Sequence, residues 1–317
     1  MVLQEFADWL VYSVLGLVKE TQLGAAANFF VYDSIKVALL LLAVTFAVGV
    51  VRTFVTRQKV RKLLGGRREG AGNVLAALLG IPTPFCSCSA VPLFMGLVES
   101  GVPLGVTFSF LIACPLINEV AVVLLFAMFG WQIAALYVGS GLVIAVLAGV
   151  VIGRLKLEKE VEGFVYRMKT KKMKESRLDW NGRIRFGLDQ SKAITLKVLP
   201  YLLLGIAVGG IIHGYAPSDF LAGIAGRGNP LAVPIAVLIG IPLYSNAAGM
   251  VPIVSVLVSK GVAVGTALAF MMSVIGLSLP EMIILRKVLK PKLLAVFAFV
   301  LFVSFTVVGY LFNAVLG

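Results

Sequence analysis

Two cysteines two positions apart, Cys86 and Cys88, are the residues of this sequence best suited to chemistry. They stand in the run Pro84-Phe85-Cys86-Ser87-Cys88-Ser89, where small polar residues follow a proline. Thiolates bind soft, thiophilic atoms, and neighbouring thiols form and exchange disulfides. Two thiols are too few for a structural zinc site, which usually takes four ligands. We therefore expect Cys86, Ser87 and Cys88 to bind a soft solute or to act as a redox pair. The alternative is that they are small buried residues that only pack.

A second group of reactive residue types, Cys114-Pro115-Leu116-Ile117-Asn118-Glu119, lies within the apolar stretch Val102–Phe129. A carboxylate at membrane depth costs at least about 3 kcal/mol unless it is protonated, paired or hydrated. We expect Glu119, with Asn118 beside it, to carry a coupling proton or to make a structural hydrogen bond to a neighbouring helix. Cys114 is a candidate third soft ligand.

The elements that must position these residues are apolar helices. Hydrophobic residues make up 60% of the 317 positions, and charged residues only 14%. At least six apolar stretches have roughly 20 residues or more, enough to cross a bilayer core of about 30 Å. They leave no length for a soluble catalytic domain. We therefore expect an all-α polytopic membrane protein that is not an enzyme and that has no cofactor and no metal site. Leu3–Val18 is shorter and is expected to form an N-terminal helix, which either spans the membrane or lies at its surface.

The positive charge of the chain is gathered beside the apolar stretches. The net charge is +13, and of the 28 lysines and arginines seven lie in Arg52–Arg68, twelve in Arg154–Lys192 and four in Arg286–Lys292. This distribution is the positive-inside pattern, so we expect all three clusters to be cytoplasmic, in a multi-pass protein of a bacterial inner membrane. The clusters are expected to contact the heads of the lipid bilayer. Nucleic-acid binding is not expected, because the basic stretches offer no aromatic platform on which bases could stack.

The chain also contains an internal repeat with an offset of 160 residues. Between Gly80–Phe110 and Gly240–Phe270, 11 of 31 ungapped positions are identical, starting with Gly-Ile-Pro in both. Chance identity between two apolar stretches would be about 10%. Glycine and proline carry backbone information, so their coincidence indicates a shared structure. Each half is therefore expected to hold one span, a broken segment and two more spans.

The basic clusters predict that the two halves are inverted. Arg52–Arg68 and Arg154–Lys192 can lie on one side only if one of the three apolar segments between them enters and leaves on that side. Asn73–Val98, broken by two prolines, is the candidate re-entrant hairpin, and Leu231–Val258 is its counterpart from the other side. We expect two inverted-topology repeats, each with three spanning helices and a re-entrant broken hairpin, as in secondary transporters. The expected division is residues 1–27 for the N-terminal helix, 28–153 for the first repeat, 154–192 for a basic cytoplasmic loop and 193–317 for the second repeat.

The tip of the second hairpin carries hydroxyl and amide groups where the first carries thiols. It reads Tyr244-Ser245-Asn246-Ala247-Ala248, and the repeat aligns Asn246 with Cys86 and Ala248 with Cys88. We expect Tyr244, Ser245 and Asn246 to bind the polar end of a solute whose soft end meets the thiols. The alternative is that small residues let the two tips pack closely.

Glu281 is the carboxylate of the second half that corresponds to Glu119, after a slip of two residues in the repeat. It follows Ser278 and Pro280 and lies nearer to the cytoplasmic end of its span. We expect a structural role for it, with pairing to Arg286.

Three motifs together resemble one known family. These are Gly-Ile-Pro-Thr-Pro-Phe-Cys-Ser-Cys-Ser-Ala-Val-Pro-Leu at Gly80–Leu93, Cys-Pro-Leu-Ile-Asn-Glu at Cys114–Glu119 and Gly-Ile-Pro-Leu-Tyr-Ser-Asn-Ala-Ala-Gly at Gly240–Gly249. They are similar to the bacterial predicted-permease family that includes YraQ and the ArsP-type organoarsenical permeases, over nearly the whole chain. The ArsP-type members export trivalent organoarsenicals with cysteines as soft ligands. The resemblance implies that role for Cys86 and Cys88, and it supports a permease more firmly than an arsenical substrate.

The sequence thus predicts an integral membrane permease for a small thiophilic or sulfur-containing solute, with trivalent organoarsenical efflux as one specific case. The solute is expected to bind between the two hairpin tips. An intramembrane thiol oxidoreductase and a passive channel are the alternatives. The expected partners are the solute and the lipid bilayer, and a homo-oligomer is left open.

Overall fold

The computed structural model describes residues 2–19, 21–52, 70–81, 87–163, 179–189, 191–192, 195–196, 199–200, 203, 229–243, 245 and 247–316. The described chain is helical, as the sequence predicts, with one isolated bridge between Val161 and Leu289. In the first half the elements are α1 (Val2–Asp8), the π-helix η1 (Trp9–Val14), α2 (Gln22–Arg52), α4 (Ala71–Gly80), α5 (Ser87–Glu99), α6 (Leu104–Leu116), α7 (Glu119–Phe129), α8 (Trp131–Arg154) and the short helix η3 (Glu158–Glu160). In the second half they are α12 (Ala232–Gly240), α13 (Ala247–Ser259), α14 (Val264–Gly276), α15 (Leu279–Leu285) and α16 (Pro291–Leu316).

Several helices are long and apolar enough to cross a membrane. Among the described residues these are Trp131–Arg154, Val264–Leu285 and Pro291–Leu316, and α6 and α7 form a fourth candidate as a pair bent by 46°. The predicted spans at Val102–Phe129 and at the C-terminus are therefore confirmed as apolar helices. The predicted span Ala193–His213 falls largely outside the described residues.

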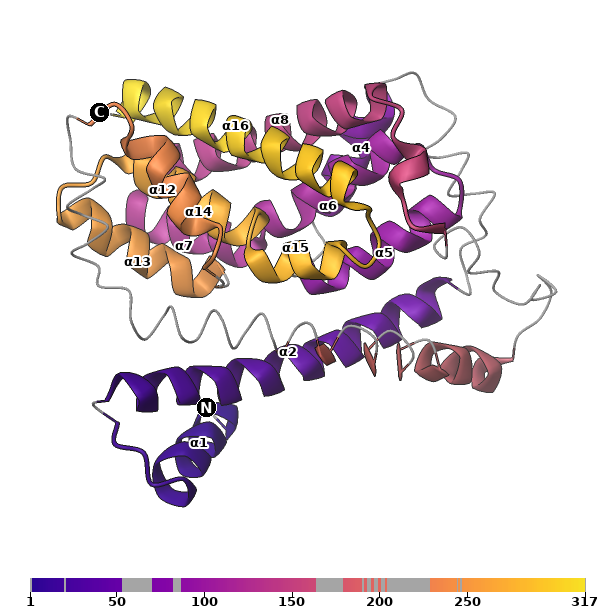
Figure 1. The fold of residues 1–317 in the computed structure, drawn as a ribbon, viewed down its shortest axis with the longest axis horizontal. Helices are drawn as coiled ribbons and strands as arrows, with labels where there is room; N and C mark the ends of the chain where they lie inside the picture. The colour runs from indigo at the N-terminus through magenta and orange to yellow at the C-terminus, as the bar shows by residue number, and fades with distance from the viewer. Residues whose placement is uncertain are drawn as a thin grey trace.

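The central helices are α6 and α14. Every residue of α6 is buried, and so are all residues of α14 except its first. In contrast, α8 and α16 each bury one face and expose the other. Figure 1 shows both helices along the edge of the bundle. Glycines let each central helix approach its outer neighbour, because a Cβ at Gly105 would lie 2.5 Å from the carbonyl oxygen of Gly149. Such small-residue contacts are how helices associate closely in lipid, where no hydrophobic force drives them together.

The ends of α5 and α8 and the starts of α6 and α16 gather at one end of the bundle. Here the amide of Glu162 donates to the carbonyl of Val288 at 2.8 Å, and the amide of Lys290 donates to Glu160 at 2.8 Å. We call this the basic end, because it carries Arg154, Lys156, Lys159, Arg286, Lys287, Lys290 and Lys292. The contact brings together two clusters that the charge pattern predicts to share one side of the membrane. It also sets the start of α16 beside the end of α8, so these two packed helices run in opposite directions.

The directions of the short helices follow from their packing on the central ones. In the first half, Asn73 of α4 donates to Ser109 of α6 at 2.9 Å, and Gly80 lies against Ala113 and Cys114, so α4 and α6 run in parallel. A four-residue turn joins α5 to α6, and the two helices pack as an antiparallel pair. Consequently α4 and α5 run in opposite directions.

The N-terminal residues pack on α2, which lies diagonally below the main bundle in Figure 1. Asn28 of α2 donates to Asp8 at 2.6 Å, and Gln4 donates to both of them. Together α1 and η1 have 13 helical residues, about 20 Å at 1.5 Å per residue, which is less than a bilayer core of about 30 Å. This pair is therefore too short to span a membrane by itself.

Candidate functional site

The span formed by α6 and α7 is interrupted at its middle. Pro115 removes a backbone donor from the last turn of α6, and Ile117 leaves the helix with φ −105° and ψ 64°. Asn118 is extended, and its side-chain oxygen accepts from the amide of Val120 at 2.8 Å. This is an N-cap contact that starts a second helix in a new direction.

The span formed by α14 and α15 breaks at the matching place. Leu277 ends α14, and the extended Ser278 precedes α15, which has Pro280 in its first turn. The amide of Leu279 donates to the carbonyl of Ile241 at 2.7 Å. Since Ile241 directly follows α12, this hydrogen bond joins the second break to the tip of the second broken segment.

The two breaks meet in the middle of the bundle. A Cβ at Gly276 would lie 3.7 Å from the Cδ1 of Leu116 and 3.2 Å from the ring of Phe305. A Cβ at Gly141 of α8 would lie 3.0 Å from the side chain of Ile117. Irregular backbone from both halves therefore lies side by side, enclosed by buried apolar side chains. Non-helical backbone at membrane depth is tolerated in such protein-lined surroundings.

Two of the cysteines, Cys86 and Cys88, belong to the first broken segment, and the third, Cys114, lies on α6. Cys86 lies outside the described residues, and Ser87 and Cys88 form part of the first turn of α5. Cys114 is fully buried on α6, and a Cβ at Gly80 would lie 3.2 Å from its backbone nitrogen. The structure thus brings Cys114 next to the last residue of α4, where the segment carrying Cys86 begins.

The second tip is described in part. Tyr244 and Asn246 lie outside the described residues, whereas Ser245 is half-buried. The backbone approaching it turns tightly, with the amide of Leu243 donating to Gly240 at 3.1 Å. A Cβ at Gly240 would lie 2.8 Å from the Cβ of Ser273, so the end of α12 lies against α14 as the end of α4 lies against α6.

The two carboxylates differ in a way that the sequence did not indicate. Glu119 is the exposed first residue of α7, a position where a negative charge faces the positive end of the helix. Glu281 is 2% exposed on α15, which packs against α5. The predicted pairing of Glu281 with Arg286 is wrong. The Nη1 of Arg286 lies 3.5 Å from the carboxylate of Glu162 instead, because five positions along a helix turn two side chains toward different faces.

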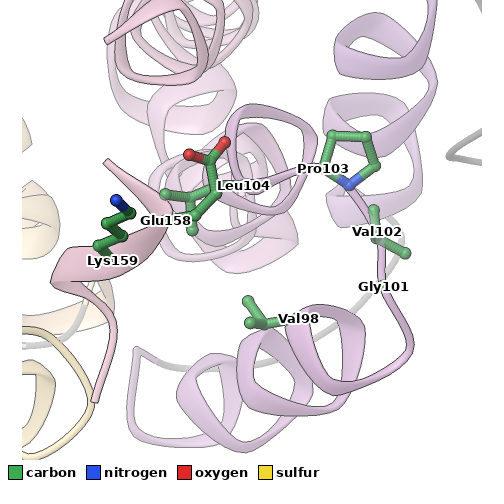
Figure 2. Close-up of a pocket in the computed structure, with 7 residues that line it drawn as sticks. All are labelled: Val98, Gly101, Val102, Pro103, Leu104, Glu158 and Lys159. Atoms are coloured by element: carbon green, nitrogen blue, oxygen red, sulfur yellow. The ribbon is translucent and has the colours of Figure 1, made fainter. Parts of the chain in front are cut away.

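A separate pocket of about 470 Å³ opens at the basic end. Figure 2 shows it between the α5–α6 turn and η3, lined by Val98, Gly101, Val102, Pro103, Leu104, Glu158 and Lys159. None of the predicted site residues that the structure describes lines it. It is therefore distinct from the place where the helix breaks meet.

Two missed features had a signal in the sequence. Pro115 with the capping residue Asn118 predicts the end of one helix and the start of another, and Ser278 with Pro280 does the same in the second half. The burial of Glu281 had no such signal, because it depends on which face of α15 meets α5.

Comparison with known proteins finds one family of predicted permeases. The family described as "Predicted permease" (ArsP_1) matches residues 22–314. UPF0718 protein MJ0584 of Methanocaldococcus jannaschii is 23% identical over 90% of this chain and 94% of its own length. UPF0718 protein YraQ of Escherichia coli is 26% identical over 82% of this chain and 73% of its own length. No solved structure was found to match the chain.

Proposed function

This chain belongs to the predicted permease family, and on that premise we propose that it moves a small thiophilic or sulfur-containing solute between two hairpin tips. The observation that carries the proposal is the close approach of Leu116 to Gly276, where a Cβ would lie 3.7 Å from the Cδ1 of Leu116 and the helix breaks of the two halves meet. Transporters bind their substrates at such meetings of discontinuous helices near the middle of the membrane.

The helix bounds support a repeat. Adding 160 to the last residue of α5 (99) gives that of α13 (259), and adding it to both bounds of α6 (104 and 116) gives those of α14 (264 and 276). The starts of α7 and α8, at 119 and 131, likewise give the starts of α15 and α16, at 279 and 291. Helix boundaries usually scatter by one or two residues, so this agreement favours one structure built twice.

The contacts between the halves support inversion. A two-fold axis that exchanges the halves would convert the packing of α7 on α13 into the packing of α15 on α5, and both contacts are present. The equivalent helices α8 and α16 run in opposite directions. With the basic end in the cytoplasm, the first half enters from the inside and the second from the outside.

The short helices support re-entrant hairpins. The 10 residues of α4 and the 13 of α5 extend about 15 and 20 Å, which is less than a bilayer core of about 30 Å. They run in opposite directions and both pack on α6. A chain that enters and leaves on one side needs this arrangement, and α12 and α13 repeat it around α14.

In this proposal the thiols and the polar tip hold opposite ends of the solute. Cys86, Ser87 and Cys88 bind its soft atom from the first hairpin, with Cys114 as a further thiol behind α4. Tyr244, Ser245 and Asn246 bind its polar end from the second hairpin. Trivalent organoarsenicals have this character, since the arsenic atom is thiophilic.

The alternatives predict different chemistry at the same thiols. An intramembrane oxidoreductase would cycle Cys86 and Cys88 between thiols and a disulfide. A passive channel would conduct its solute at a rate that does not depend on an ion gradient. Proton coupling through Glu119 and Asn118 is proposed only for the permease, because neither alternative moves a solute with a proton.

The experiment compares arsenic-sensitive bacteria that express the natural chain, the Cys86→Ser, Cys88→Ser double variant or a Cys114→Ser control. Cells are challenged with a methylated trivalent arsenical, and its uptake is measured in everted membrane vesicles. We expect protection and uptake with the natural chain, loss of both in the double variant, and at least partial retention in the control. Absence of uptake by well-inserted natural protein would reject the arsenical substrate. Equal uptake by the double variant would reject the thiol site.

A further inference from the structure

Tyr137 of α8 carries a polar atom that the packing of the bundle does not use. Its side chain is completely buried, and its hydroxyl has no hydrogen-bond partner in the part of the chain that the structure describes. Buried polar groups in native proteins are almost always paired, because an unpaired one is costly. The simplest explanation for an unpaired hydroxyl inside a helical bundle is a ligand or a water molecule that binds to it.

Tyr137 stands one helical turn from the break of the first half. Gly141 follows four residues later on the same face of α8, and a Cβ there would lie 3.0 Å from the side chain of Ile117, where α6 ends. Four residues rise about 6 Å along a helix. Because α8 ends with Arg154 at the basic end, the step from Gly141 back to Tyr137 leads toward the opposite end of the bundle. In the proposed topology Tyr137 therefore lies between the meeting of the breaks and the outer side of the membrane.

The equivalent position of the second half has the aromatic ring without the hydroxyl. Adding 160 to 137 gives Phe297 of α16, and the two helices begin at equivalent positions. Phe297 is buried, its ring centroid lies 5.5 Å from that of Phe108, and the ring of Phe108 lies 5.1 Å from that of Phe94. Phe297 thus fills its place through packing alone. A ring at this position serves the fold in both halves, and the hydroxyl of Tyr137 is an addition to it.

The neighbours of the two rings differ as well. With the same offset, Phe94 and Phe108 correspond to Val254 and Leu268, which are both completely buried. The two-fold axis of the proposed function therefore pairs the aromatic cluster around Phe297 with smaller aliphatic side chains around Tyr137. Apolar walls with few polar groups are typical of binding sites for small molecules.

We propose that the hydroxyl of Tyr137 binds the polar end of the solute when the bundle opens on its outer side, an inference that rests on the proposed function and adds a residue to its site. A phenol hydroxyl is neutral, and it can donate one hydrogen bond and accept others. The buried face of α8 from Ala134 to Ile152 carries no charged residue, and apolar surroundings disfavour an unpaired ion. The class of solute is therefore a neutral molecule that has a thiophilic atom and a hydroxyl group, as hydroxylated trivalent arsenicals do.

The first experiment measures binding of a methylated trivalent arsenical to the purified full chain in mild-detergent micelles by titration calorimetry. It compares the natural chain with Tyr137→Phe and with the matched control Tyr310→Phe, which removes an exposed hydroxyl that donates to the carbonyl of Pro230. We expect Tyr137→Phe to raise the Kd about fivefold to tenfold, as the loss of one hydrogen bond does, and Tyr310→Phe to leave it unchanged. The stability of Tyr137→Phe should not fall, because the hydroxyl has no partner within the described fold.

Two results of this titration would overturn the proposal. One is a Kd that is the same in the natural chain and in Tyr137→Phe. The other is a loss of stability in Tyr137→Phe with an unchanged Kd, which would indicate that the hydroxyl holds an internal water molecule and not the solute.

The second experiment does not depend on the identity of the solute. Tyr137→Cys and Ile152→Cys are made in a chain that lacks the natural cysteines, and intact cells are treated with a small membrane-impermeant thiosulfonate. Both positions are completely buried on α8, and Ile152 lies near the basic end. We expect Tyr137→Cys to react and Ile152→Cys to stay unmodified, since only the first faces a path that opens outward. A Tyr137→Cys variant that never reacts would overturn the proposal. If the natural chain binds no arsenical, the proposed substrate fails, and the labelling alone supports or overturns a solute path at Tyr137.

Discussion

Replacing Gly149 by alanine should destabilise the protein at a close contact between α6 and α8. The added Cβ would lie 2.6 Å from the carbonyl oxygen of Gly105 and 2.8 Å from the Nδ2 of Asn73, and it would overlap the Oγ of Ser109. The first of these atoms belongs to the backbone of a fully buried helix and cannot move aside by a rotation. The other two form the hydrogen bond between α4 and α6, at 2.9 Å.

Two costs and one gain set the magnitude. Overpacking costs about 1–3 kcal/mol, and a buried amide that loses its hydrogen bond costs about 1–3 kcal/mol more. Alanine in place of glycine in a helix returns up to about 1 kcal/mol. We therefore expect a net loss between about 1 and 6 kcal/mol for Gly149→Ala, centred on about 3 kcal/mol.

The matched control is Gly139→Ala in the same helix, because a Cβ at Gly139 meets nothing within 4 Å. Its stability should be unchanged or higher by up to about 1 kcal/mol. Both variants are purified in mild-detergent micelles and unfolded by titration with a denaturing detergent, with helicity as the signal. Stabilities of the two variants that agree within about 0.5 kcal/mol would refute the close packing of α6 on α8.

Three further predictions use the same titration. The hydroxyl of Tyr137 is buried with no hydrogen-bond partner, so Tyr137→Phe should keep or raise stability by up to about 2 kcal/mol, and a clear loss would contradict this. Asn118→Ala should cost about 1 kcal/mol because α7 loses its N-cap, while Asn118→Ser should restore most of it; equal losses would argue against capping. The pair Arg286–Glu162 is 49% and 35% exposed, so Arg286→Gln should change stability by less than about 1 kcal/mol, and less still in high salt; a larger loss would indicate a buried partner.

The broad architecture could be predicted from the sequence because its signals are local. Apolar stretches of sufficient length give the helices at Val102–Phe129 and at the C-terminus, and the prolines at positions 82 and 84 give the interruption between α4 and α5. The family could be predicted for a related reason, since glycine, proline and cysteine at fixed spacing are constrained by backbone geometry and chemistry.

The details of the site depend on packing and are not readable from single positions. Glu119 and Glu281 look alike in the sequence, yet one is exposed and the other buried, because burial depends on the face that each helix turns to its neighbours. The close approach of Leu116 to Gly276 could not be predicted either, because it brings together positions far apart in the chain. The breaks at Ile117 and Leu277 were predictable from their proline and capping residues but were obscured by continuous hydrophobicity.

The central claim is that the two halves cross the membrane in opposite directions, and equivalent turns test it most directly. Ser100 and Lys260 occupy the same position in the two repeats, since 100 plus 160 is 260, and each begins the turn after a hairpin helix. Each is replaced by cysteine in a chain that lacks the natural cysteines, and intact cells are treated with a membrane-impermeant maleimide. The account predicts that Lys260→Cys is labelled in intact cells and that Ser100→Cys is labelled only after the membrane is opened. Labelling of both from the same side would contradict the inverted arrangement.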